Sequence, residues 1–179
     1  AVDADGKTGD GAGIHVEIPK DFFIEKIEVT GHDYDNSEIC VGMIFLPRND
    51  YSSQENCKTI VESELTKNDF SIYGWRQVPV NPKVLGVKAL QTMPEIIQVL
   101  FKSNDPNLLD KNLERKIYET RKRIENKAFD ASLNNFYICS ISSKSIIYKG
   151  LYLAEAISDF YLDLKDTRFI SRYAIFHQR

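Results

Sequence analysis

The first group of residues that could do chemistry lies near the start of the chain. Asp3–Gly13 reads DADGKTGDGAG, a run of acidic residues and glycines. A calcium loop would need ligands where Lys7 and Ile14 stand, so this run does not fit a calcium site. A dinucleotide loop follows a strand, whereas these glycines precede one, and Asp10 would repel a phosphate. The pattern therefore predicts a tight loop that feeds a strand, because glycine tolerates positive φ and close approach.

The second group lies in the last third of the chain, Ser142–Arg179. This stretch predicts strands at Ser145–Tyr152 and Tyr173–His177 around one short amphipathic helix. The sequence then closes on His177, Gln178 and Arg179 without a turn or a polar tail. We expect a buried strand here that delivers polar side chains to a site.

The cysteines and histidines give no sign of a metal site. The three cysteines, Cys40, Cys57 and Cys139, are widely spaced and odd in number, so neither a disulfide framework nor a metal clip is indicated. Cys40 and Cys139 lie in apolar runs, where a free cysteine behaves as a small hydrophobic residue. His15 has no second histidine nearby, and metal sites need clustered ligands. We therefore expect no metal ligands in this chain.

Composition predicts one soluble globular domain over residues 1–179. The chain is 42% hydrophobic and 27% charged, with a net charge of −3. Such a balance gives no electrostatic reason to expect nucleic acid or a membrane as a partner. No apolar run approaches the roughly 20 residues of a membrane-spanning helix, and the first residues do not resemble a secretory signal. We expect a cytoplasmic protein.

Hydrophobic periodicity predicts the elements that position these residues. Leu109 is assigned to the apolar stripe of the longest helix. Trp75 is expected to fill the core with its indole N–H hydrogen-bonded, in preference to forming a stacking platform. Strands outnumber helices, which favours an α+β fold with antiparallel sheet. Helices are predicted at Lys20–Ile27 and Asn107–Phe129, and a further helix is predicted to begin after a cap at Asp50 or Ser52. The other predicted strands are Ile14–Ile18, Glu38–Leu46, Phe70–Val80, Glu95–Lys102 and Asn134–Ser140.

Four separated blocks carry a resemblance to a known family. They are AVDADGKTGDGAGI at 1–14, VGMIFLPRN at 41–49, GWRQVPVNPKVLG at 74–86, and the pair SSKSIIYKGLYLAEAISDFYLDL and SRYAIFHQR in the last third. In this order they resemble the class-II glutamine amidotransferase domain at the start of the glutamate synthase large subunit. The resemblance implies the N-terminal-nucleophile hydrolase fold, a four-layer αββα sandwich with antiparallel sheets, here incomplete at both ends.

The resemblance also implies a chemistry. In that family an N-terminal cysteine attacks the side-chain amide of L-glutamine, and the released ammonia is added to 2-oxoglutarate to give glutamate. This chain begins with Ala1, and none of its cysteines has a free α-amine. We therefore expect a chain that lacks the nucleophile, binds no cofactor and is inactive alone. The parent protein is expected to use FMN and an iron–sulfur cluster, with NADPH or ferredoxin as electron donor.

Only one substrate-binding residue is carried over by position. The resemblance places Arg179 on the α-carboxylate of glutamine, and a guanidinium suits a carboxylate with two parallel hydrogen bonds. It also makes Gly9, Asp10, Gly11 and His177 candidates for the pocket wall. A structural turn at the glycines and a solvated charge at Arg179 remain open alternatives.

Two functions from different classes follow. The chain is either part of the glutaminase domain of a glutamate synthase or a nucleophile-less amidotransferase-like module that binds or scaffolds a partner. The first implies as partners L-glutamine, the remaining synthase domains of the same polypeptide, and a small reductase subunit or ferredoxin. It also implies the bacterial cytoplasm or, in a photosynthetic eukaryote, the plastid stroma.

Overall fold

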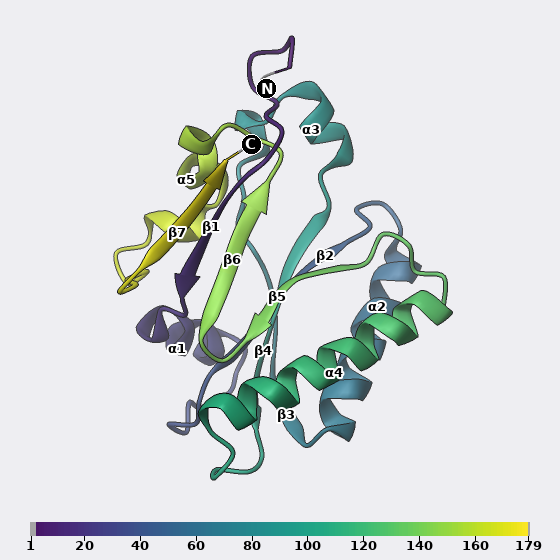
Figure 1. The fold of residues 1–179 in the computed structure, drawn as a ribbon, viewed down its shortest axis with the longest axis vertical. Coiled ribbons are helices and arrows are strands. Elements are labelled where there is room, and N and C mark those ends of the chain that lie inside the picture. Colours follow the sequence, from purple (N-terminus) through teal and green to yellow (C-terminus); the bar gives the residue numbers. More distant parts are fainter. Residues whose placement is uncertain (1–2, 179) are drawn as a thin grey trace.

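The computed structural model describes residues 3–178 and contains two antiparallel sheets (Figure 1). The three-stranded sheet has the order β6-β1-β7, in which β1 is Ala12–Glu17, β6 is Ser145–Gly150 and β7 is Ala174–Gln178. Its register sets Gly13 opposite Lys149 on one side and His177 on the other. The N-terminal loop before β1 and the end of β7 therefore lie at the same end of this sheet (Figure 1).

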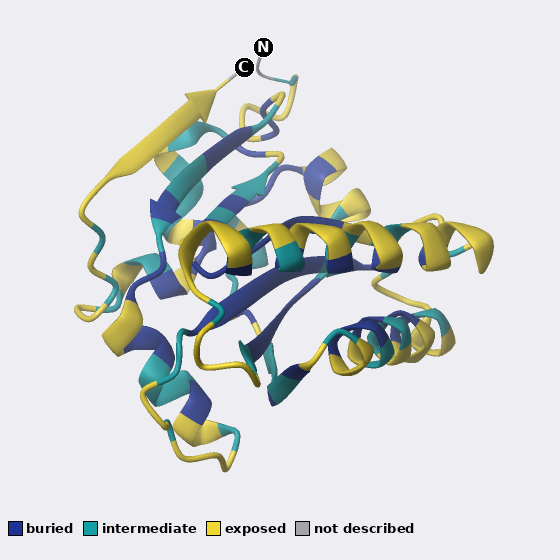
Figure 2. Ribbon diagram, turned by 60° about the horizontal axis from the view of Figure 1, so that its bottom comes forward, coloured by how far each residue is buried: buried dark blue, intermediate teal, exposed yellow. Residues whose placement is uncertain are grey.

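The four-stranded sheet has the order β3-β4-β2-β5. With two long helices it follows the succession βαββαβ, and this strand order is that of a ferredoxin-like unit. The helices α2 and α4 pack against each other on one face of the sheet, with their outer sides exposed (Figure 2). The elements of the unit are β2 Cys40–Leu46, α2 Tyr51–Lys67, β3 Phe70–Gln77, β4 Glu95–Ser103, α4 Asp110–Asp130 and β5 Tyr137–Ser142.

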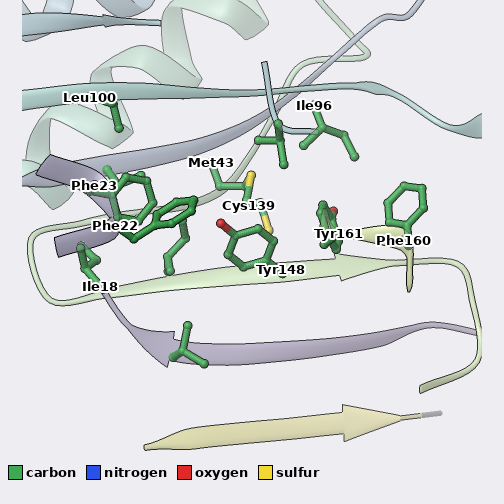
Figure 3. Close-up of a cluster of buried hydrophobic side chains, with 14 of the residues drawn as sticks. Ile18, Phe22, Phe23, Met43, Ile96, Leu100, Cys139, Tyr148, Phe160 and Tyr161 are labelled. Atoms are coloured by element: carbon green, nitrogen blue, oxygen red, sulfur yellow. The ribbon is translucent and has the colours of Figure 1, made fainter. Parts of the chain in front are cut away.

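A hydrophobic core lies on each face of the four-stranded sheet. Between the two sheets, Met43 faces Tyr148 of β6, and Phe22 and Phe23 of α1 (Lys20–Val29) fill the space beside them, next to Leu100 (Figure 3). The second core lies between the sheet and the helices α2 and α4. Because β2 is buried on both faces, its sequence is continuously apolar rather than alternating.

Shorter elements close the ends of the sandwich. They are α1 Lys20–Val29, α3 Val87–Thr92 and α5 Ile157–Phe160, with 3₁₀ turns at Pro82–Val84, Ala154–Ala156 and Leu162–Lys165. Helix α3 lies beside the N-terminal loop, beyond the end of the three-stranded sheet (Figure 1). Within residues 3–178 no helix has both the length and the apolar character needed to cross a bilayer.

A buried polar cluster joins the two sheets. Arg76 of β3 donates two hydrogen bonds, each of 2.8 Å, to the carboxylate of Asp163. The hydroxyl of Tyr148 donates to the same carboxylate at 3.0 Å and accepts from Gln98 at 3.2 Å. Since every buried partner is hydrogen-bonded, the desolvation of these groups is offset and the cluster fixes how the sheets face each other.

The predicted fold class is confirmed. The chain is an α+β protein with two facing antiparallel sheets, as in an N-terminal-nucleophile hydrolase sandwich. The spacing of the strands Asn134–Ser140 and Ser145–Tyr152 predicts a hairpin, and this prediction was wrong, because β5 and β6 follow each other along the chain but pair in different sheets. The burial expected of Cys40 and Cys139 in their apolar runs is confirmed.

Several local predictions were wrong. The strand before His177 is not buried, because β7 pairs only with β1 in the described chain and all five of its residues are exposed. Leu109 is 52% exposed, because it has an extended backbone and precedes α4 instead of joining its apolar stripe. By contrast, of the two caps expected for α2, Asp50 is confirmed, since its carboxylate accepts from the amide of Ser53 at 3.0 Å. Trp75 is only half-buried, although its indole N–H is bonded, as expected, to Glu62 at 2.7 Å.

Candidate functional site

The segment before β1 is a compact loop organised by one carboxylate. Asp5 accepts hydrogen bonds from the amides of Lys7 and Thr8 at 2.9 and 2.7 Å, and from the Thr8 hydroxyl at 2.6 Å. These donors, the Thr8 hydroxyl first among them, hold the pKa of Asp5 well below its ordinary value. The spacing of Asp5 and Thr8 is that of a side-chain-capped turn, a signal that the sequence contains.

The glycine loop, Gly9, Asp10 and Gly11, follows directly. Gly9 is buried, and a Cβ there would lie 2.6 Å from the carbonyl oxygen of Tyr152. Gly11 has φ of +135°, which favours glycine, and leads into β1 beside Gly150. The glycines therefore permit close backbone approach, as the sequence predicted, and Asp10 lies exposed between them.

His177 lies over the start of β1. A Cβ on Gly13 would lie 2.4 Å from the Cε1 atom of His177, so the imidazole covers this glycine. A cavity of about 380 Å³ opens beside it. The cavity is lined by Ala12, Gly13, Ala154, Ile157, Phe176, His177 and Gln178. Apolar walls with an imidazole and an amide at one side suit a small ligand with a polar end.

The sequence-predicted site residues are brought together only in part. The glycine loop and His177 come to the same end of the three-stranded sheet, and His177 lines the cavity. Gly9, Asp10 and Gly11 immediately precede the lining residues of β1. Arg179 and Ala1 lie outside the described residues.

Sequence reasoning missed the apolar residues that line this cavity. Ala154 and Ile157 come from the turn and helix after β6, and Phe176 comes from β7. Apolar side chains carry no chemical signal of their own. Only the glycine at position 13, the third in GDGAG, indicated that something must approach β1 closely.

The three cysteines are unsuited to nucleophilic attack. All are buried and unpaired, on β2, α2 and β5 respectively. Burial raises the pKa of Cys57 to about 11 and that of Cys139 to about 12, and it raises the pKa of Cys40 as well. The reactive species of a cysteine is the thiolate, so these thiols are inert near neutral pH.

No metal site is formed within residues 3–178, where no three histidine, cysteine, aspartate or glutamate side chains converge. The cysteines lie on separate elements and do not fit an iron–sulfur cluster, which needs converging thiolates. A larger cavity, of about 840 Å³, lies between the end of β2, α3 and the end of β6. It contains none of the sequence-predicted site residues.

The fold is that of an α+β protein with two facing antiparallel sheets, and it carries a glycine loop and a small cavity at one end of the three-stranded sheet. The family model described as "Glutamine amidotransferases class-II" matches residues 1–179. The chain therefore belongs to the class-II glutamine amidotransferases.

The curated relatives that the chain resembles are glutamate synthases. The chain is 50% identical over 179 residues to the glutamate synthase [NADPH] large chain of Azospirillum brasilense, covering all of this chain and 12% of the relative. It is 40% identical over 178 residues to ferredoxin-dependent glutamate synthase 1 of Arabidopsis thaliana, covering 98% of this chain and 11% of the relative. A ferredoxin-dependent glutamate synthase 2 from Synechocystis is 34% identical over 177 residues, with coverage of 98% and 11%. The chain thus spans about one ninth to one eighth of the length of these relatives.

Proposed function

We propose that this chain is part of the glutaminase domain of a glutamate synthase, which hydrolyses L-glutamine to glutamate and ammonia for transfer to 2-oxoglutarate. The observation that carries this proposal is the whole-chain match to the amidotransferase family together with 50% identity to a glutamate synthase large chain. The small cavity that follows the glycine loop, with His177 and Gln178 at its polar side, supports the proposal, because an amino-acid side chain would fit there.

In this proposal the chain supplies walls of the glutamine pocket, not the attacking thiol. The glycine loop and His177 form part of the wall, and Arg179 binds the α-carboxylate through its guanidinium. The nucleophile comes from a cysteine outside these 179 residues, since the three present here are buried with raised pKa values. The chain by itself is accordingly inactive.

The remaining chemistry belongs to other parts of the proposed full polypeptide. FMN and an iron–sulfur cluster would supply electrons for reduction of the imine formed with ammonia, and the three cysteines of this chain lie on separate elements and do not fit such a cluster. NADPH and ferredoxin are both named for relatives of this chain, so the donor would be one of these. A small reductase subunit or ferredoxin is the corresponding partner, and the compartment is the bacterial cytoplasm or the plastid stroma.

The proposal is tested by measuring ammonia release from L-glutamine with the full natural protein and its Arg179→Ala variant. We expect the wild-type protein to release ammonia and the variant to show a KM for glutamine about 10- to 100-fold higher, because a charge-assisted pair is lost. Arg179→Lys keeps the positive charge but cannot form two parallel hydrogen bonds to a carboxylate. Its KM for glutamine should therefore lie between those of the wild type and Arg179→Ala.

Arg172→Ala is the matched control. Arg172 lies in the same segment and pairs with Glu17, but its side chain is 86% exposed, so its loss should leave the KM nearly unchanged. A full protein that releases no ammonia would overturn the glutaminase proposal and favour a binding or scaffolding module. An equal KM for the Arg179→Ala variant and wild type would remove Arg179 from the site.

A further inference from the structure

The carboxylate of Asp5 reaches beyond its own loop. Besides its bonds to Lys7 and Thr8, it accepts a hydrogen bond at 2.9 Å from the backbone amide of Val87, 82 residues further along the chain. Val87 is the first residue of α3. One side chain therefore satisfies donors of the N-terminal loop and of α3 together, and we call this set of bonds the Asp5 anchor.

Gly86 is required by this contact. Its φ of −73° and ψ of 168° are open to any residue, so backbone conformation does not demand glycine here. A Cβ on Gly86, however, would lie 2.2 Å from an Asp5 carboxylate oxygen and 2.1 Å from the Thr8 hydroxyl oxygen. The Asp5 anchor and a side chain at position 86 cannot occupy the same space.

An ion pair beside the anchor adds a second link. The ammonium of Lys88 lies 2.6 Å from a carboxylate oxygen of Asp3. The Lys88 side chain is largely exposed, so this pair contributes little energy and the anchor itself determines the position of the loop.

The anchor lies directly before the glycine loop. Thr8 is buried and bonded to Asp5 through both its amide and its hydroxyl. The next residue, Gly9, packs against the Tyr152 carbonyl, in the segment that leads to Ala154 of the cavity wall. A shift of Asp5 would therefore move Thr8 and Gly9 relative to that wall.

We infer that Asp5 is a positioning residue of the glutamine pocket, which holds the glycine loop in place by bonding it to α3 at Gly86 and Val87. This inference rests on the proposed function for the identity of the ligand. It explains why two sequence blocks far apart in the chain, DADGKTGDG and NPKVLG, form one structural unit. Asp5 touches no reacting atom in this arrangement and acts through the backbone of Thr8 and Gly9.

The test compares Asp5→Asn with wild type in the full natural protein, using ammonia release from L-glutamine. An asparagine keeps the shape but loses one acceptor oxygen, so the bonds to Thr8 and Val87 cannot all remain. We expect the KM for glutamine to rise about tenfold while kcat and the thermal midpoint change little, since only the pocket wall moves. Gly86→Ala should give the same change, and the double variant should add almost nothing, because both release the same contact.

Asp50→Asn is the matched control. Asp50 binds the amide and hydroxyl of Ser53 at 3.0 and 2.6 Å, as Asp5 binds those of Thr8, but it caps α2 and does not line the candidate cavity. We expect it to lower the thermal midpoint slightly and to leave the KM unchanged.

Hydrogen exchange gives an independent readout of the anchor. In wild type the amides of Thr8 and Val87 should be protected, and in Asp5→Asn at least one of them should exchange faster, because they bond to different carboxylate oxygens and asparagine keeps only one acceptor, with no change at Ser53. If wild type releases no ammonia, the proposed function fails. If wild type is active but Asp5→Asn has an unchanged KM, or if Asp50→Asn raises the KM equally, the positioning role of Asp5 is overturned and the proposed function stands.

Discussion

Tyr148 and Tyr152 are both fully buried, but their hydroxyls have different surroundings. The Tyr148 hydroxyl bonds to Asp163 and Gln98, at 3.0 and 3.2 Å. The Tyr152 hydroxyl is buried without a hydrogen-bond partner among the described residues. A buried polar atom without a partner carries its desolvation cost uncompensated. The two residues therefore contribute to stability in opposite ways through the same chemical group.

This contrast predicts different results for two identical substitutions. Tyr148→Phe should lower the free energy of unfolding by about 1–3 kcal/mol, because it leaves part of the buried Arg76–Asp163 cluster unsatisfied. Tyr152→Phe should be neutral or stabilising by up to about 1 kcal/mol, because only an unpaired hydroxyl is lost. Urea unfolding of the 179-residue chain, followed by fluorescence, measures both. Equal destabilisation by the two variants would show that Tyr152 has a partner in solution.

At the scale of residues, candidate site residues could be predicted from the sequence, but contacts between distant residues could not. The glycines predicted a tight loop because glycines at close spacing carry a conformational meaning, whereas the resemblance made this loop and His177 candidates for the pocket wall. The contact between Asp5 and Val87 could not be predicted, since it depends on where α3 lies after the intervening chain has folded. Asp5 and Thr8 at turn spacing were visible in the sequence, but the turn alone does not identify its distant partner.

At the scale of elements, β3 contains an irregularity that one glycine permits. The register of β3 with β4 shifts between Ile72 and Gly74, and Gly74 has φ of +151°. A Cβ on Gly74 would lie 2.9 Å from two carbon atoms of Thr30, whose hydroxyl donates to the Tyr73 carbonyl at 2.8 Å. The bulge thus fixes α1, which ends at this threonine cap, against β3.

Gly74→Ala should therefore destabilise the chain by about 2–3 kcal/mol, through strained φ and the clash with Thr30 together. Gly31→Ala is the matched control, because Gly31 also has positive φ, of +84°, but a Cβ there meets nothing within 4 Å. Gly31→Ala should lower the free energy of unfolding by only about 1 kcal/mol, because it strains the backbone but causes no clash. Thermal unfolding of both variants makes the comparison, and an equal loss in both would show that Thr30 moves aside freely.

The elements themselves were largely predictable, and their pairing was not. Continuous apolar runs such as that of β2 and the helical period of α4 are local signals, so most helices and strands were located within a few residues. The order β3-β4-β2-β5 arises from contacts between segments far apart in sequence, which periodicity does not encode. The exposed Leu109 shows the same limit, because its hydrophobicity fits a stripe that begins only after it.

At the scale of the whole molecule, the two sheets differ in how well their strands are enclosed. The four-stranded sheet has a hydrophobic core on each face, whereas the three-stranded sheet ends in β7 (Figure 2). This strand pairs only with β1 in the described chain, and its Phe176 is 68% exposed. An open, apolar strand edge offers unpaired backbone groups to any other strand.

We therefore expect the 179-residue chain on its own to self-associate as its concentration rises, by pairing β7 with β7 of a second copy. Phe176→Lys should shift this association to at least several-fold higher concentration, because a charge at an edge strand opposes pairing. Phe129→Lys is the matched control, since Phe129 is 81% exposed but lies on α4, which has no open strand edge. Sedimentation velocity over a concentration series distinguishes the variants. A wild-type chain that stays monomeric throughout, or an equal effect of the two substitutions, would show that β7 is not the associating edge, and the exposed helical surface would then be the region to examine.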